Sequence, residues 1–326
     1  MIHRGDRGEP VAITGLGAVS GYGEGTAALW TGLASGTSAI GPFSRFEHAR
    51  YRTQLASEVD ETRLELAPAH AKRLSLADRF ALAAAGEALT EAGLPARLDE
   101  LSCGIYFGSS TGGMFESEGY FAALLGRPQR ASGIGRLTAQ PTCSPGENVG
   151  RAYGVHGPVQ TVASACASAT LAMGNALAAL RAGEIDIALA GGSDSLCRLT
   201  YAGFNSLRAV DPRACRPFRS ESEGMSIGEG AAVLVLETAA SARARGARIL
   251  GWLLGAGASC DAHHMTAPDP QGAGIARAVE AAFADSGLQA SDIDFVNVHG
   301  TGTAHNDAAE ANMLRAVFGD RLTTLP

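Results

Sequence analysis

A cysteine lies where the sequence predicts the junction between a strand and a helix. The apolar run of residues 159–163 predicts a buried strand, and small residues then lead into a helix predicted over residues 170–177. Cys166 would therefore lie beside the N-terminus of the helix, where free N–H groups and the positive end of the helix dipole favour a thiolate. Such a thiolate could act as a nucleophile. The alternative is a buried cysteine that serves only as a small apolar side chain.

A histidine lies at the end of a second predicted strand, residues 294–298. It opens the run His-Gly-Thr-Gly-Thr, residues 299–303, and the helix predicted to begin at residues 306–307 carries Glu310. A histidine at a strand end, followed by glycines and hydroxyl groups, can face a cleft, although a lone histidine is more often structural. His299 and Cys166 together offer an imidazole and a thiol at two strand ends.

The Cys-Ala-Ser and His-Gly-Thr-Gly-Thr motifs together resemble the β-ketoacyl-[acyl-carrier-protein] synthases of the I/II type, in the thiolase superfamily. The likeness runs from about Val11 to the last residue. It implies a decarboxylative Claisen condensation in fatty-acid or polyketide biosynthesis, in which a cysteine takes an acyl group from a carrier protein and malonyl-carrier protein then loses CO2. In this resemblance Cys166 matches the nucleophile, and His299 matches the first of two histidines that hold the malonyl thioester. No cofactor is implied apart from the carrier's phosphopantetheine arm.

The same resemblance implies a set of substrate-binding residues, which would shape the acyl pocket and its gate or contact the pantetheine arm. They are Thr111, Phe204, His264, Thr266, Thr301 and Thr303. From the residue types alone, plain core positions and a solvated loop are the simpler interpretations. Asp307 and Glu310 match an acidic pair that orders the start of a second-half helix, and an N-cap and a first-turn acid would suit these positions equally well.

The elements that must position these residues alternate between strands and helices. Predicted strands cover residues 11–17, 101–107, 159–163, 185–190 and 231–237, and predicted helices cover residues 26–33 and 75–91. Strand 250–258, helix 274–286 and strand 294–298 repeat that order more weakly. Such alternation calls for an α/β architecture with covered sheets. The resemblance implies more: a thiolase-like duplication of βαβαβαββ halves in a five-layered αβαβα sandwich.

Two halves are expected, with the nucleophile in residues 1–248 and the His-Gly-Thr-Gly-Thr motif in a partial second half, residues 249–326. In the family a second histidine, a lysine and a glycine-rich segment follow this motif, and the sequence shows no match to them. The resemblance thus predicts a C-terminally truncated second half, and a chain that, as given, loads an acyl group slowly and fails to condense it. Residues 216–225 also depart from the family pattern at Arg219, Ser222, Glu223 and Met225, which leaves room for a specialised polyketide-type or aryl-polyene-type enzyme.

Composition limits the other classes. The chain has 326 residues and a net charge of −7, so nucleic acid is not an expected partner. Six scattered cysteines lack paired metal-ligand spacing, and no metal site is expected. No signal peptide and no apolar run long enough to span a bilayer is evident, so a cytoplasmic protein without a membrane partner is expected.

The expected partner is an acyl carrier protein, which is acidic and would need a local basic patch on this acidic chain. The candidates are Lys72, Arg73, Arg208 and Arg213. A homodimer is also expected, because in the family the strand that leads into the nucleophile pairs with its twofold mate. A heterodimer with a related ketosynthase subunit is the alternative.

Three other functions would require different residues from those of a ketosynthase. A type III, chalcone-like synthase would use a Cys-His-Asn set, and the asparagine motif is missing. A degradative thiolase would use a second cysteine late in the chain, but none follows Cys260. A non-catalytic partner subunit that sets chain length usually loses the nucleophile, and Cys166 is retained.

Overall fold

The computed structural model describes residues 9–64, 73–126 and 133–323. Their centre is a seven-stranded sheet in the order β10-β1-β9-β7-β5-β6, with the short β2 paired to β1. Its strands are β1 (Val11–Ser20), β2 (Gly23–Glu24), β5 (Cys103–Gly108), β6 (Val159–Val162), β7 (Ile187–Asp194), β9 (Gly230–Thr238) and β10 (Gly251–Leu253). β5 runs parallel to β6 and β7, whereas β9 is antiparallel to β1 and β7. A small second sheet joins β3 (Gly41–Pro42), β4 (Leu55–Ser57) and β8 (Ile227–Gly228).

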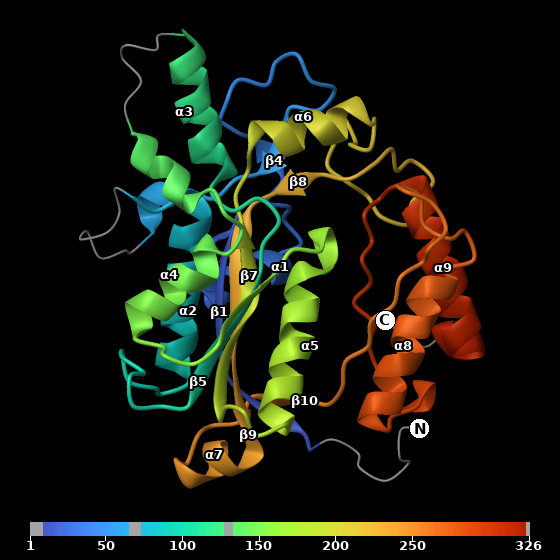
Figure 1. Cartoon of the computed structure of the whole chain (residues 1–326). Helices are drawn as coiled ribbons and strands as arrows, with labels where there is room; N and C mark the ends of the chain where they lie inside the picture. Colours follow the sequence, from blue (N-terminus) through green and yellow to red (C-terminus); the bar gives the residue numbers. More distant parts are fainter. Residues whose placement is uncertain (1–8, 65–72, 127–132, 324–326) are drawn as a thin grey trace.

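Helices cover both faces of the large sheet (Figure 1). The helices are α1 (Thr26–Ala34), α2 (Leu76–Glu91), α3 (Met114–Gly126), α4 (Ser144–Tyr153), α5 (Ser168–Arg181), α6 (Arg198–Ser206), α7 (Ala239–Ala244), α8 (Ala273–Ser286) and α9 (Ala304–Phe318). α2 and α4 lie on one face, α5 lies on the other, and α8 and α9 lie beyond α5. The predicted α/β class is therefore confirmed.

The two faces of the sheet have separate apolar cores, as the two-residue period of a strand requires. Ile105 and Phe107 of β5 face the α2 side with Phe80, whereas Tyr106 faces the α5 side with Leu177. Both faces of the central strands are thus buried, which explains why these strands are apolar almost throughout. Helix α2 begins with a capping box, in which the Ser75 hydroxyl accepts from the Asp78 backbone N–H and the Asp78 carboxylate accepts from that of Ser75.

The first turn of α5 packs directly on the ends of two strands because those strands end in glycine. A Cβ atom added to Gly108 of β5 would lie 2.3 Å from the backbone nitrogen of Ala169, and one added to Gly192 of β7 would lie 2.9 Å from the Ala169 side chain. Only glycine permits this approach. The close packing brings the N-terminus of α5 to the carboxyl end of the parallel strands.

Two predicted strands differ in the structure. Residues 294–298 pair with no described strand, and the chain runs as a loop from the 3-10 helix Ala290–Asp292 to α9, which Figure 1 shows at the red end of the chain. Of residues 250–258 only β10 is a strand, and it pairs with β1 in the large sheet. A strand needs a neighbour that satisfies its backbone groups, and the described residues supply none for residues 294–298. A second large sheet is accordingly not formed within them, although α8 confirms the helix predicted at 274–286.

The sequence predicts that the strand before Cys166 is buried. For the single chain this prediction is wrong. β6 is the last strand of the sheet and pairs only with β5 among the described residues. Val159 and Gln160 are exposed, with 42% of Val159 accessible. In the described part of the chain, no helix has the length and apolar character needed to cross a bilayer.

Candidate active site

Cys166 lies on a sharp turn between β6 and α5. Ala165 has a φ of 46°, a left-handed conformation that is uncommon for a residue with a Cβ. It is also the first residue of a short 3-10 turn, Ala165–Ala167. Ser168, the first residue of α5, holds this turn with its hydroxyl. It accepts from the Ser164 backbone N–H at 2.8 Å and donates to the Ala165 carbonyl at 2.6 Å. The turn leaves Cys166 exposed.

His299 is held by two carboxylates of α9. The two oxygens of Glu310 accept the backbone N–H groups of His299 and Gly300, both at 2.7 Å. Asp307 accepts the backbone N–H of Gly302 at 3.0 Å. Both carboxylates are buried, so these charge-assisted hydrogen bonds fix the backbone of the loop that precedes α9.

The structure brings the Cys166 thiol and the His299 imidazole close enough for each to shift the pKa of the other. The interaction with His299 is the largest cause that lowers the pKa of the Cys166 thiol; partial burial opposes it, and the charge of the imidazolium and the backbone N–H of Cys166 itself reinforce it. The same interaction raises the pKa of His299, against the effect of burial, and the nearby carboxylates of Glu310 and Asp307 add to the rise. Each of the two groups thus favours the charged form of the other.

Three other cysteines are poor candidates for a nucleophile. Burial raises the pKa of Cys103 to about 12 and also raises the pKa of Cys197 and of Cys143. A thiol with a raised pKa carries little thiolate at neutral pH. The described residues contain no group of three or more His, Cys, Asp or Glu side chains that could hold a metal ion.

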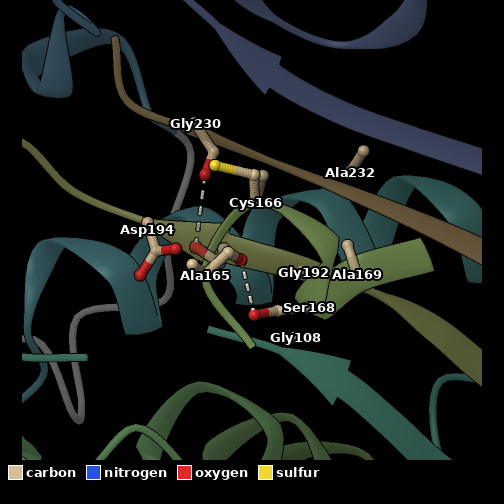
Figure 2. A pocket seen from close by; sticks show the side chains of 11 residues that line it. Gly108, Ala165, Cys166, Ser168, Ala169, Gly192, Asp194, Gly230 and Ala232 are labelled. Carbon is tan, nitrogen blue, oxygen red and sulfur yellow. Dashed lines mark hydrogen bonds between the residues drawn. The ribbon is translucent and has the colours of Figure 1, made fainter. Parts of the chain in front are cut away.

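A pocket of about 300 Å³ adjoins Cys166 at the ends of β5, β7 and β9 (Figure 2). Glycine and alanine form most of its wall, which explains how such tightly packed elements leave a space. The lining residues are Gly108, Ala165, Cys166, Ser168, Ala169, Gly192, Ser193, Asp194, Gly230, Ala231 and Ala232. A small acyl group attached to Cys166 could enter this space.

Sequence reasoning missed two residues of this pocket. Asp194 ends β7, and its carboxylate accepts the hydroxyl of Ser109, the backbone N–H of Ser110 and both the N–H and the hydroxyl of Thr111, at 2.8–3.0 Å. It therefore orders the segment that follows β5. In the sequence, the signal for Asp194 is an acidic residue directly after Gly191, Gly192 and Ser193. The signal for Ser168 is a serine two residues after Cys166.

The residues expected to shape the acyl pocket lie outside its wall. The Thr111 hydroxyl is used by Asp194, and Thr111 does not line the pocket. Phe204 lies on α6, is half-buried and likewise does not line the pocket. Their expected role in substrate binding stays a prediction.

The residues expected at the pantetheine arm fall into two groups. Thr301 and Thr303 lie in the His299 loop, and their hydroxyls are 2.8 Å apart in a mutual hydrogen bond. Thr303 is also the N-cap residue of α9. His264 and Thr266 lie in an exposed loop, where the Nδ1 of His264 accepts the Thr266 backbone N–H at 3.1 Å. Contact of either group with a pantetheine arm stays a prediction.

The basic residues expected to bind a carrier protein differ in whether nearby acidic side chains offset their charges. Arg73 and Arg208 are exposed. Arg213 lies 3.5 Å from Glu223 and 3.9 Å from Asp211, so its charge is partly offset. Lys72 lies outside the described residues.

Comparison with known proteins identifies relatives of the whole chain. The family described as "Beta-ketoacyl synthase, N-terminal domain" matches residues 8–242, and "Beta-ketoacyl synthase, C-terminal domain" matches residues 250–325. The chain is 37% identical to nodulation protein E of Rhizobium meliloti (strain 1021) over 95% of this chain and 77% of that protein. It is 33% identical to 3-oxoacyl-[acyl-carrier-protein] synthase 2 of Staphylococcus aureus (strain COL), again over 95% and 77%.

Solved structures of ketosynthases also resemble this chain. The ishigamide ketosynthase/chain length factor matches with a TM-score of 0.88 and 35% identity, over 95% of this chain and 78% of that chain. A type II PKS acyl-carrier protein in complex with its ketosynthase bound to the hexaketide matches with a TM-score of 0.85 and 27% identity, over 97% and 79%. The fold is thus the thiolase-like α/β fold of ketosynthases.

Replacing His299 by alanine should raise the pKa of the Cys166 thiol, because the interaction with the imidazole that lowers it is lost. At a pH below the pKa, alkylation of Cys166 by iodoacetamide should slow about tenfold for each pKa unit of the rise. Mass spectrometry of the modified peptides against pH measures this, with the exposed Cys260 as the internal control. An unchanged pH profile for Cys166 in His299→Ala would contradict the assigned cause.

Proposed function

Because the chain belongs to the β-ketoacyl synthase family, we propose that it is an acyltransferase that condenses an acyl group on Cys166 with a malonyl group on acyl carrier protein to form a 3-oxoacyl product. The closeness of Cys166 and His299 carries this proposal. It pairs a thiol of lowered pKa with an imidazole, which is the arrangement of an activated cysteine nucleophile.

The first step would be transfer of the acyl group to the enzyme. The thiolate of Cys166 attacks the carbonyl carbon of the acyl thioester, a new C–S bond forms, and the thiolate of the pantetheine arm leaves. The exposed turn gives the thioester access to the sulfur. The backbone N–H of Cys166 would donate to the oxyanion that develops during attack. The 300 Å³ pocket would receive the acyl group.

The second step would form the carbon–carbon bond. The malonyl thioester loses CO2, and the electron pair left behind becomes an enolate-like carbanion whose oxygen needs hydrogen-bond donors. His299 would be such a donor, since even a neutral imidazole carries one ring N–H. The carbanion then attacks the acyl thioester on Cys166, and the cysteine thiolate leaves. No cofactor beyond the phosphopantetheine arm takes part in this scheme.

A non-catalytic subunit that sets chain length is the main alternative. Among the structural relatives is one described as a ketosynthase/chain length factor, so partner subunits occur close to this family. The retained thiol of Cys166 and its contact with His299 disfavour that role here. A related subunit could still be the partner of this chain in a heterodimer.

Incubation with an acyl-carrier protein should place one acyl group on Cys166. Cys166→Ala should show no adduct, and Cys260→Ala, which removes another exposed thiol, should load as the unmodified chain does. In a chain extended with the family segment that carries the second histidine and the lysine, His299→Ala should slow CO2 release from malonyl-carrier protein by about 10²–10³, the usual effect of losing one oxyanion donor. Intact-protein and peptide mass spectrometry measure loading, and labelled malonate measures CO2 release. An adduct on Cys260 or Cys215 with none on Cys166 would refute the proposal.

Carrier-protein docking would use the exposed arginines Arg73 and Arg208, together with Arg213. Arg208→Glu should raise the KM for a carrier-bound substrate roughly 1.4- to fivefold, as expected for an exposed ion pair of about 0.2–1 kcal/mol. Arg213→Glu should act less, because Glu223 and Asp211 already offset that charge. Steady-state loading kinetics measure both variants. The KM for a pantetheine thioester without the carrier is the control, and an equal rise in that KM would argue against docking.

A dimer would form through β6, whose outer edge and Val159 are exposed in the single chain. An exposed strand edge with an apolar side chain is a natural site for pairing with a second strand. Val159→Glu should therefore shift the chain from dimer to monomer, whereas Val159→Thr, which keeps a β-branched residue, should not. Sedimentation velocity at micromolar concentration distinguishes them. A monomer for the unmodified chain at that concentration would exclude a stable homodimer.

A further inference from the structure

The loop that carries His299 is held from two sides. One side is α9, through Asp307 and Glu310. The other side is the segment Arg216–Gly224, which belongs to the half of the chain that carries Cys166. Ser222 of this segment donates its hydroxyl to the carbonyl of Gly302 at 2.6 Å. The backbone N–H of Phe218 donates to Asp307 at 2.8 Å.

The segment is anchored firmly in its own half. The fully buried carboxylate of Asp211 accepts the backbone N–H of Arg213 at 2.9 Å, that of Glu223 at 3.0 Å and the guanidinium of Arg216 at 3.2 Å. Arg216 also donates to the carbonyl of Glu221. A buried carboxylate with several donors is a strong constraint on the backbone that it binds. The place of Ser222 is therefore set by the half that carries Cys166.

The contact between the segment and the His299 loop is close. Gly302 has a φ of 78°, and a Cβ atom at this position would lie 2.6 Å from the carbonyl oxygen of Gly224 and 3.0 Å from the Ser222 hydroxyl. A Cβ atom on Gly300 would contact the ring of Phe218 at 3.5 Å. The two backbones thus touch without an intervening side chain, so a small shift of one is transmitted to the other.

Phe218 shows that the segment is itself constrained. Its φ of 59° is an outlier for an aromatic residue, and such a conformation persists only where the surroundings hold it. The hydrogen bond from its N–H to Asp307 is such a restraint. Because Asp307 also accepts the N–H of Gly302, one carboxylate joins the segment to the loop.

We propose that Ser222 is a positioning residue that holds the Gly302 carbonyl and thereby keeps His299 beside Cys166. The inference deepens the proposed function and rests on it, since it assigns the alignment of the imidazole with the nucleophile to a residue of the opposite half. Ser222 touches neither substrate nor the reacting atoms in this account. Its effect passes through the loop of residues 299–303.

The test compares Ser222→Ala with Ser286→Ala. Both replace a half-buried serine whose hydroxyl donates to a backbone carbonyl, at 2.6 Å for Ser222 and 2.8 Å for Ser286, which lies on α8. Both should lower the midpoint of urea denaturation. Only Ser222→Ala should move the pH profile of Cys166 alkylation by iodoacetamide to higher pH and slow alkylation at neutral pH, by roughly three- to tenfold for one lost hydrogen bond.

Two further variants distinguish positioning from general stability. Ser222→Thr keeps the hydroxyl and should restore the profile. In a His299→Ala background, Ser222→Ala should slow alkylation no further, because the contact it protects is already gone. Equal profiles for Ser222→Ala and Ser286→Ala, or an additional slowing in the His299→Ala background, would overturn the proposal.

Alkylation by iodoacetamide needs neither carrier protein nor malonyl substrate. The result therefore separates the two ideas. A shifted profile in a chain that transfers no acyl group would leave the role of Ser222 intact and refute the proposed function. An unshifted profile in a chain that does transfer one would refute the role of Ser222 alone.

Discussion

The interaction between the Cys166 thiol and the His299 imidazole is the one on which the site depends. It joins two side chains that lie far apart in the sequence and that belong to the two regions matched by different family domains. The interaction weakens as the two groups move apart, so both backbones must be held in place. Much of the surrounding structure restrains those two backbones: Ser168 holds the turn at Cys166, and Glu310 and Asp307 hold the loop at His299.

Close backbone packing is the second constraint, and it uses glycine where other residues would clash. Gly108 and Gly192 let the first turn of α5 approach the ends of β5 and β7, and Gly302 lets the His299 loop approach Gly224. The same small residues leave the pocket beside Cys166. Close packing and the pocket therefore have one cause, which is the small size of the residues at these positions.

Carboxylates that are buried or, for Asp194, half-buried do most of the positioning, and they do so through backbone N–H groups. Asp194 orders the segment after β5, Asp211 orders the segment that carries Ser222, and Glu310 orders the loop that carries His299. A carboxylate can accept several hydrogen bonds at once, and in a buried place each is stronger than in water. These acids shape the site without reacting. The proximity of Glu310 and Asp307 also contributes to the raised pKa of His299.

The sequence by itself determined the α/β class, the helices α2, α5, α8 and α9, and the places of Cys166 and His299 at the ends of predicted strands, because hydrophobic period, glycines and capping residues act over a few neighbouring positions. It could not determine which strands pair. Residues 294–298 are apolar enough for a strand, yet pair with no described neighbour, and β6 lies at an exposed edge. It also could not show that His299 lowers the pKa of Cys166, that Asp194 binds the segment after β5, or that Ser222 binds the loop of His299. Those facts depend on hydrogen bonds between residues far apart in the chain, and only the tertiary structure brings such partners together.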